Sequence, residues 1–170
     1  ALTSMRFTRQ GQSCTAASRI YVERPIFDAF VAEMETAVNA MVMGDPLDET
    51  TDIGTIISEG QFEKVRGFIE EGKRTPGAVA HECSAMPSDP ALKKGLFLRP
   101  VIFTGLDGSS RLVREEIFGP VTVIQPFDDA EAVLKEANDS EYGLAASLWT
   151  NDLKVGLDLA HRLEAGLVQI

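Results

Sequence analysis

The sequence predicts an α/β fold in which a mostly parallel sheet lies between two layers of helices. Three observations support this three-layer α/β/α prediction. Short apolar runs with strand character alternate along the chain with longer segments whose apolar residues recur every three or four positions. Glycine, proline and helix-capping residues separate these segments. Strands that alternate with helices form crossover units, which place helices on both faces of a parallel sheet.

The first predicted strand covers residues 19–24, and Pro25 then opens a helix because its fixed φ angle suits the first helical turn. The apolar side chains of this helix form one stripe, and Gly44 follows at the expected stop. Residues 45–57 are polar and turn-rich, which indicates a surface connection. The stripe consists of Phe27, Phe30, Val31, Met34, Val38, Met41 and Val42.

A second helix is expected to begin at Ser58, which fits a capping box with Gln61, and to end at Gly72. Residues 78–83 have the composition of a short buried strand, whereas the prolines and glycine of residues 84–95 indicate a loop. The apolar face of the helix consists of Phe62, Val65, Phe68 and Ile69.

Two further strands are predicted at residues 98–103 and 121–127. Pro100 places the first of them either at a sheet edge or with its start at the proline. Asp128 with Glu131 then suggests a capped helix. The remaining predicted segments are an apolar run at 144–149, a helix from Thr150 or Asn151 to just before Gly166, and a strand at 167–170.

The composition excludes several classes of protein. The chain of 170 residues carries 26 acidic and 16 basic side chains, and its net charge of -10 repels phosphate backbones and anionic membrane surfaces. We therefore expect neither a nucleic-acid nor a membrane partner. Cys14 and Cys83 are too few for a disulfide framework, and no Cys/His spacing predicts a metal site. With no signal-peptide pattern, these features predict a reduced, cytoplasmic protein.

Cys14 is the strongest candidate for chemistry. Gly11 breaks the preceding helical stretch, and Ser13 is expected to cap a new helical turn that carries Cys14 and Thr15 on its first positions. Unpaired amides at such a helix start stabilise a thiolate and can hold the oxyanion that forms when the sulfur attacks a carbonyl. The local pattern leaves an alternative open, in which Cys14 is a small buried apolar residue like many free cysteines.

Other chemistry-bearing residues have plainer interpretations on local pattern alone. Cys83 lies in an apolar strand segment with no helix start nearby, so we expect it to be buried and unreactive. His81 and His161 are expected to be structural or surface residues. Taken alone, the segment 115–118 would be an exposed acidic pair followed by a core aromatic ring.

Several motifs resemble those of the aldehyde dehydrogenase superfamily, and together they cover essentially all 170 residues. The segment QGQSCTAASRIYV at 10–22 resembles the active-site cysteine segment of that family, and EEIFGPV at 115–121 resembles its second hallmark. Because these motifs occur in the family's order, chance agreement is a poor explanation. The further matching segments are GDPLDETTDIGTIIS, QFEKVRGFIEEGK, GLFLRPVIF, ANDSEYGLAASLWTNDL and EAGLVQI.

The resemblance implies specific roles. Cys14 matches the nucleophile that forms a thiohemiacetal with an aldehyde; the thiohemiacetal carbon then loses hydride to NAD or NADP, and the resulting thioester is hydrolysed. The backbone amide of Cys14 matches one oxyanion donor. Glu116 matches the carboxylate that binds the nicotinamide ribose, and Phe118 matches the ring that packs near the nicotinamide. Ser13 and Thr15 would line the substrate pocket. The full-length enzyme is expected to be a homo-oligomer.

The resemblance also implies missing parts. The family's general-base glutamate, its dinucleotide-binding domain and the asparagine of its oxyanion hole match no residue here, and both ends of the sequence look cut. We therefore expect residues 1–170 to be a single catalytic domain, truncated at both ends and inactive by itself. Arg9 and Thr55 depart from the commoner Asn and Pro, which leaves the substrate class open. Two alternatives remain: a non-catalytic module that self-associates or binds a partner, and a CoA-acylating relative.

Overall fold

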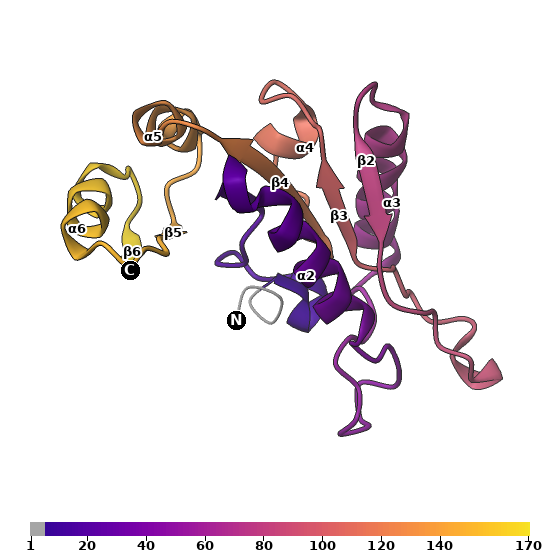
Figure 1. The fold of residues 1–170 in the computed structure, drawn as a ribbon. Coiled ribbons are helices and arrows are strands. Elements are labelled where there is room, and N and C mark those ends of the chain that lie inside the picture. Colours follow the sequence, from indigo (N-terminus) through magenta and orange to yellow (C-terminus); the bar gives the residue numbers. More distant parts are fainter. Residues whose placement is uncertain (1–5) are drawn as a thin grey trace. The chain divides into compact units, whose positions relative to one another are not determined.

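The computed structural model describes residues 6–170 and confirms the α/β fold (Figure 1). Helices and strands alternate along the chain, and the chain forms two compact units, Ala1–Pro126 and Phe127–Ile170, called here the larger and the smaller unit. The prediction of one catalytic domain over residues 1–170 stays a prediction. In chain order the elements are η1 (Thr8–Gly11), β1 (Arg19–Glu23), η2 (Arg24–Ile26), α2 (Phe27–Asn39), α3 (Glu59–Arg74), β2 (Val79–Glu82), η3 (Pro90–Leu92), β3 (Val101–Thr104), α4 (Arg111–Arg114), β4 (Val121–Phe127), α5 (Ala130–Asn138), β5 (Ala145–Ser147), α6 (Leu153–Arg162) and β6 (Leu167–Gln169).

The larger unit is built on a four-stranded sheet in the order β1-β4-β3-β2. Strands β3 and β4 are parallel, with Val101 opposite Val121. Strand β2 joins the edge in the antiparallel sense, with Val79 opposite Thr104. The strand expected at 78–83 is present as β2, but because β2 is an edge strand its residues are only partly buried, so the expected burial was wrong.

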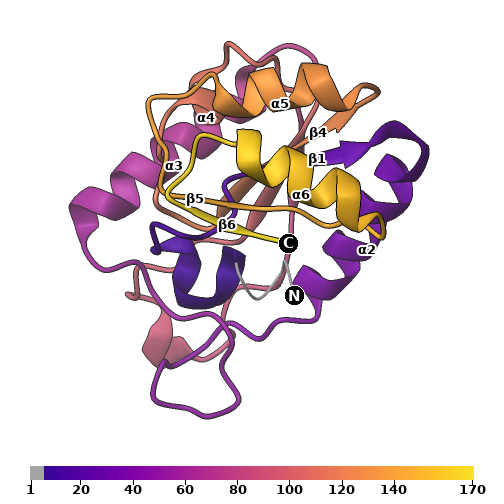
Figure 2. The same cartoon turned by 90° about the vertical axis from the view of Figure 1, so that its left-hand side faces the viewer.

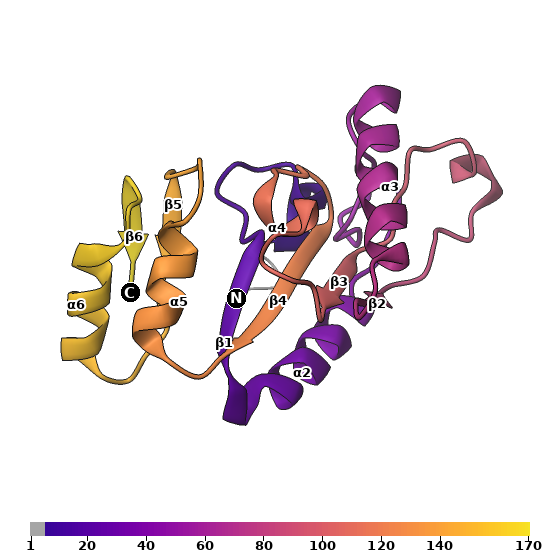
Figure 3. The same cartoon turned by 90° about the horizontal axis from the view of Figure 1, so that it is seen from above.

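Helices cover both faces of this sheet, as Figures 2 and 3 show for α2 on one side and α3 with α4 on the other. The alternation of side chains along a strand explains the arrangement, because neighbouring residues point to opposite faces. The cluster on the α2 side consists of Phe7, Ile20, Val22, Val31, Met34, Val38, Met43, Ile53, Cys83, Phe97, Ile102 and Ile124. The cluster on the α3 side consists of Val65, Phe68, Ile69, Val101, Phe103, Leu106, Leu112, Val113, Ile117, Val121 and Val123.

Local sequence signals start the helices of the larger unit where they were predicted. Pro25 lies in the first turn of η2, which runs directly into α2. The Ser58 hydroxyl accepts a hydrogen bond of 3.3 Å from the backbone N–H of Gln61 and so caps α3. The Gln61 side chain does not return to Ser58, so only half of the predicted capping box is present.

Two glycines do not end helices as predicted. Helix α2 ends at Asn39 rather than at Gly44, because the chain turns to form a bridge between Met43 and Ile53. Helix α3 passes Gly72 and ends at Arg74. A Cβ built on Gly72 would lie 2.6 Å from side-chain atoms of Phe103 and Leu112, so close helix-to-sheet packing explains this glycine.

Pro100 precedes the most buried strand of the sheet. All four residues of β3 are buried, and β3 pairs with β4 on one side and β2 on the other. Of the two predicted alternatives, the edge position was therefore wrong and the strand start was right. A proline at that place costs no hydrogen bond of the ladder, since the first residue of a strand needs none.

The smaller unit consists of α5, β5, α6 and β6, with the two short strands parallel and Ala145 opposite Leu167. Its helices are capped by Asp129, which accepts from the N–H of Ala132 at 2.7 Å, and by Asp152. The predicted cap at Asp128 was one residue too early, and the helix start predicted at Thr150 or Asn151 precedes the observed cap, Asp152, by one or two residues.

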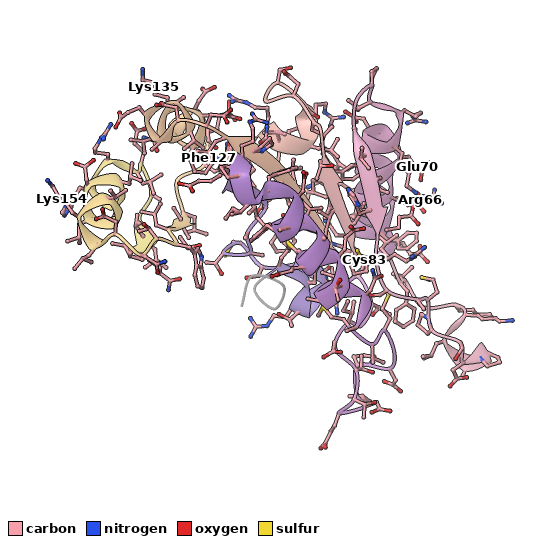
Figure 4. All side chains as sticks on the ribbon, in the orientation of Figure 1. Arg66, Glu70, Cys83, Phe127, Lys135 and Lys154 are labelled. Carbon is pink, nitrogen blue, oxygen red and sulfur yellow. The ribbon has the colours of Figure 1, made fainter. Side chains whose placement is uncertain are left out.

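Much of the smaller unit is polar and exposed on its helices, as Figure 4 shows for Lys135 on α5 and Lys154 on α6. The ion pair of Arg162 with Glu131 joins α6 to α5, and the ion pair of Arg162 with Asp158 lies within α6. Its buried hydrophobic residue is Leu134, and large apolar side chains are left exposed. These are Tyr142, Leu144, Trp149, Leu153, Val155, Leu157, Leu167 and Ile170.

Within residues 6–170, none of the helices combines the length and the apolar composition needed to cross a bilayer.

Candidate active site

Cys14 lies on an exposed loop of residues 12–18, called here the cysteine loop, between η1 and β1. A turn closes around it, because the N–H of Ala16 donates to the carbonyl of Ser13 at 3.0 Å. No helix starts in this loop, so the predicted helix cap at Ser13 was wrong; the chain makes the single turn of Ser13–Ala16 and then enters β1. The alternative of a buried Cys14 is also excluded by its exposure.

The backbone immediately before the cysteine loop has an unusual conformation. Arg9, Gln10 and Gly11 have φ angles of 62°, 57° and 67°, which places three consecutive residues in the left-handed region. L-residues visit this region rarely, so surrounding contacts must hold it. Gly11 is the residue there that adopts the conformation without cost.

Two glutamine side chains provide part of that support by joining the cysteine loop to the segment before α3. The N–H of Ile57 donates to the Oε1 of Gln12 at 3.0 Å. The Gln10 amide, in the orientation that satisfies both of its ends, donates to the carbonyl of Thr55 at 3.1 Å and accepts from the N–H of Gly54. The loop is therefore tied to the predicted surface connection at 45–57.

The second hallmark segment forms a turn, Glu116–Pro120, that lies against the start of the cysteine loop. A Cβ built on Gly11 would lie 2.1 Å from the carbonyl oxygen of Gly119, which leaves room only for glycine. Arg6 adds a second link, because its Nη2 donates to the same carbonyl oxygen at 2.6 Å. The structure thus brings together the two segments that the sequence singled out.

Helix α3 holds the Glu116–Pro120 turn from the other side. The Nε2 of Gln61 donates to the carbonyl oxygens of Ile117 at 3.0 Å and Phe118 at 2.9 Å. The Nζ of Lys64 donates to the carbonyl oxygen of Glu116 at 3.0 Å. These bonds support Phe118, whose φ of 54° also lies in the left-handed region.

The predicted site residues differ in exposure. Glu116 is exposed and Phe118 is half-buried. Ser13 and Thr15 are the sequence neighbours of Cys14, and their hydroxyl oxygens lie 3.3 Å apart. Among residues 6–170, no group accepts a hydrogen bond from the backbone N–H of Cys14.

Cys83 differs from Cys14 in its burial and in its surroundings. It is fully buried in the cluster on the α2 side (Figure 4), and burial raises the pKa of its thiol to about 11. Nearby, His81 lies between the Glu35 carboxylate, 2.9 Å from Nδ1, and the Thr104 hydroxyl, 3.4 Å from Nε2. This cluster holds the edge strand β2 to α2 and lies apart from the Glu116–Pro120 turn in the sheet order.

Sequence reasoning missed several residues that build the site. Gln61 was interpreted only as a capping residue, and Arg6, Gln12 and Lys64 carried no local signal. Their partners are main-chain groups of segments distant in sequence; Arg6 and Gly119 are 113 residues apart. No local pattern predicts such contacts.

Comparison with known proteins identifies the family. The model of the aldehyde dehydrogenase family matches residues 1–170. The chain is 43% identical over 164 residues to 5-carboxymethyl-2-hydroxymuconate semialdehyde dehydrogenase from Escherichia coli, and this alignment covers 95% of the present chain and 35% of the relative. It is 40% identical over 164 residues to human retinaldehyde dehydrogenase 3, and this alignment covers 96% of the present chain and 31% of the relative.

A solved structure agrees with these sequence matches. The NAD⁺ complex of an aldehyde dehydrogenase from Bacillus cereus matches 99% of this chain and 33% of its own, with a TM-score of 0.90 and 37% identity. The chain is thus an α/β protein with an exposed thiol on a loop that directly follows Gly11, and Gly11 contacts the Glu116–Pro120 turn. It belongs to the aldehyde dehydrogenase family, and it spans about a third of the length of the relatives it matches.

Proposed function

We propose that residues 1–170 form the thiol-bearing catalytic part of an NAD(P)-dependent aldehyde dehydrogenase, which oxidises an aldehyde to a carboxylic acid. The observation that supports the proposal best is the contact between Gly11 and Gly119. It holds the loop that carries the exposed Cys14 against the turn that carries Glu116 and Phe118. A nucleophile and a polar-aromatic turn are therefore neighbours on one scaffold.

In the proposed reaction the ionised sulfur of Cys14 attacks the aldehyde carbon, and the carbonyl electron pair moves to oxygen. The backbone N–H of Cys14 is available to donate to that oxygen, since no described residue accepts from it. When bound, oxidised NAD or NADP supplies the acceptor for the hydride that leaves the carbon. Cys14 then carries a thioester, and attack by water breaks the carbon–sulfur bond, releases the acid and returns the thiol.

The chemistry of the turn fits the nicotinamide half of such a cofactor. Glu116 presents an exposed carboxylate, a group that accepts hydrogen bonds from ribose hydroxyls. Phe118 is half-buried, and its carbonyl oxygen accepts a hydrogen bond from Gln61. Ser13 and Thr15 lie on either side of the nucleophile and would line the aldehyde pocket. The relative from Bacillus cereus was solved with NAD⁺, which supports the same assignment.

The proposal names aldehydes as a class. One relative is named for an acidic semialdehyde and another for retinaldehyde, at 43% and 40% identity. Water is the proposed acyl acceptor, and CoA is the alternative. A homo-oligomeric complete enzyme in the cytoplasm belongs to the same proposal.

Acylation of the thiol tests the nucleophile without any cofactor. The chain is incubated with p-nitrophenyl acetate, and released nitrophenolate is measured together with the acetylated residue by mass spectrometry. We expect acetylation at Cys14, and none above background in Cys14→Ala. Acetylation that is equal at Cys14 and Cys83 would contradict the proposed role.

The 170-residue chain alone is expected not to oxidise aldehydes. No residue here matches the family's general base or the second oxyanion donor, and a positioned base typically contributes about 10²–10⁴ in rate. Incubation with NAD or NADP and a panel of aldehydes should give no absorbance from reduced cofactor. A cofactor-dependent increase above a Cys14→Ala control would overturn this expectation.

A second candidate function is self-association without catalysis. The observation that favours it is the exposed apolar side chains of the smaller unit, which include Trp149 at 67% and Leu153 at 68% exposure. Light scattering after size-exclusion chromatography, with an apolar dye, tests this candidate. A monomer that binds no dye contradicts it.

A further inference from the structure

Arg6 is the one arginine that the structure buries almost completely among the described residues, with 1% of its surface exposed. Its Nη2 donates to the carbonyl oxygen of Gly119, and its Nη1 donates to the hydroxyl of Ser18 at 3.3 Å. Ser18 is the last residue of the cysteine loop, and Gly119 belongs to the Glu116–Pro120 turn. One guanidinium group therefore spans the two segments of the proposed site.

The position is electrostatically costly. Burial lowers the pKa of Arg6 to about 10, and the negative charge of Glu116 opposes this decrease. The side chain is therefore still a cation at neutral pH, and Glu116 is the carboxylate that acts on it. Among residues 6–170, no acceptor is found for the buried Nε of Arg6. A buried cation with an unpaired donor is poorly explained by stability, because an apolar residue of similar size is often at least as stabilising.

We propose that Arg6 is a positioning residue, which sets the Glu116–Pro120 turn relative to Cys14. This inference rests on the proposed function and extends it to a residue that does not touch the reacting atoms. The guanidinium holds the Gly119 carbonyl by a hydrogen bond and acts on the Glu116 carboxylate through its charge. Through Ser18 it holds the exit of the cysteine loop, and so the orientation of the Cys14 amide.

The other contacts of the Gly119 carbonyl strengthen this assignment. The N–H of Val121 donates to it at 2.7 Å, and the backbone of Gly11 approaches it closely. The carbonyl of Ser18 accepts from the N–H of Val123 at 3.0 Å. Loss of the Arg6 contacts should therefore loosen the amides of Val121 and Val123 before those of more distant strands.

Arg99 offers a matched control within the same unit. Its Nε donates to the carbonyl of Ser84 at 2.9 Å, and its Nη2 donates to the carbonyl of Glu82 at 3.0 Å. It is thus also an arginine that binds main-chain carbonyls, but its partners lie at the end of β2 and not in the Glu116–Pro120 turn. A general loss of arginine contacts would affect both variants alike.

The test compares Arg6→Met, Arg6→Lys and Arg99→Met in the 170-residue chain by amide hydrogen exchange. For Arg6→Met we expect exchange at residues 117–124 to rise at least about tenfold, with residues 79–82 unchanged. Arg6→Lys keeps the charge and one donor, so its exchange should lie between wild type and Arg6→Met. Arg99→Met should affect residues 82–84 and leave residues 117–124 unchanged. A uniform rise over the larger unit, or no rise at residues 117–124, would overturn the proposal.

Cys14 acetylation by p-nitrophenyl acetate, measured on the same variants, gives a readout that stability alone would not move. Complete loss of one oxyanion donor slows acyl transfer by about 10²–10³, and a misplaced donor should lose part of that effect. We therefore expect the rate of Cys14 acetylation to fall at least about tenfold in Arg6→Met. Arg99→Met should acetylate at the wild-type rate, and equal decreases in both variants would contradict positioning. If wild-type Cys14 is not acetylated faster than Cys83, the proposed function fails, whatever the exchange data show. If Arg6→Met does not fold, Arg6→Lys and Ser18→Ala carry the same comparison with smaller local effects.

Discussion

The backbone of Gly11 lies directly against the carbonyl oxygen of Gly119, so closely that a Cβ on Gly11 would be 2.1 Å from that oxygen. The φ of Gly11 is also positive, at 67°. Both features exclude any side chain at this position. The contact joins the cysteine loop to the Glu116–Pro120 turn, and it is therefore the first place to test how the site is assembled.

Gly11→Ala is expected to lower the free energy of unfolding by at least about 2 kcal/mol, because left-handed strain and steric overlap both act. Gly67→Ala is the control, since Gly67 lies within α3 and a Cβ added there would meet nothing within 4 Å. That substitution should raise stability by about 0.5–1 kcal/mol through helix propensity. Urea unfolding measures both changes. Equal stability of Gly11→Ala and wild type would mean that the close approach is absent.

The two cysteines should differ strongly in reactivity. Cys14 is exposed, whereas Cys83 is fully buried and burial raises the pKa of its thiol to about 11. At pH 8 we expect iodoacetamide to label Cys14 at least about tenfold faster than Cys83, which must wait for local opening. Peptide mass spectrometry follows both sites, and labelling in denaturant should remove the difference. Faster labelling of Cys83 in the folded chain would contradict the structure.

The elements were predictable from sequence where local patterns determine them. Strand β4 has the predicted bounds, and Pro25 and Ser58 begin helices where expected. The errors have tertiary causes. Glycine is a residue type that often ends helices, but Gly72 allows close packing against Phe103 instead. Serine is a residue type that often caps helices, but no helix begins at Ser13.

The candidate site was predictable only in its motifs. The Cys14 and Glu116 segments could be singled out, because each has a family pattern within a few residues. Their assembly could not be, since it depends on contacts from Arg6 and Gln61 to main-chain carbonyls far along the chain. Such contacts carry no sequence signal, because the partner's side chain is not involved.

Gln61 gives a sharp test of how the Glu116–Pro120 turn is supported. Its Nε2 donates to two carbonyl oxygens, those of Ile117 and Phe118. Gln61→Met removes both bonds at similar size and should cost about 1–2 kcal/mol. Gln61→Glu places a carboxylate against the same carbonyls and should cost more than Gln61→Met at pH 7, but once protonated it should be at least as stable as Gln61→Met, because its O–H can donate to one of the carbonyls. Urea unfolding at pH 7 and pH 4 distinguishes them, and a Gln61→Glu variant as stable as wild type at pH 7 would refute the contact.

Glu82 predicts a pH dependence at the edge of the sheet. Its carboxylate pairs with Lys73 of α3 and, at 3.1 Å, with Arg99. The hydrogen bond from Lys73 and the positive charges of both partners lower the pKa of Glu82 in the folded chain, against an opposing effect of burial. Because folding favours the ionised form, the stabilisation is present above the unfolded pKa of about 4.3 and is lost as the pH falls through the lower folded value.

Glu82→Gln should therefore reduce the free energy of unfolding by up to about 1 kcal/mol at pH 7, and the difference from wild type should shrink as the pH falls below about 4. Glu63→Gln is the control, because Glu63 forms an exposed pair with Arg66 on α3 and should change stability by at most a few tenths of a kcal/mol. Urea unfolding of the three chains between pH 3 and pH 8 makes the comparison. A Glu82→Gln difference that stays constant over this range would show that the ion pairs do not hold β2 to α3, because only an ionised carboxylate can form them.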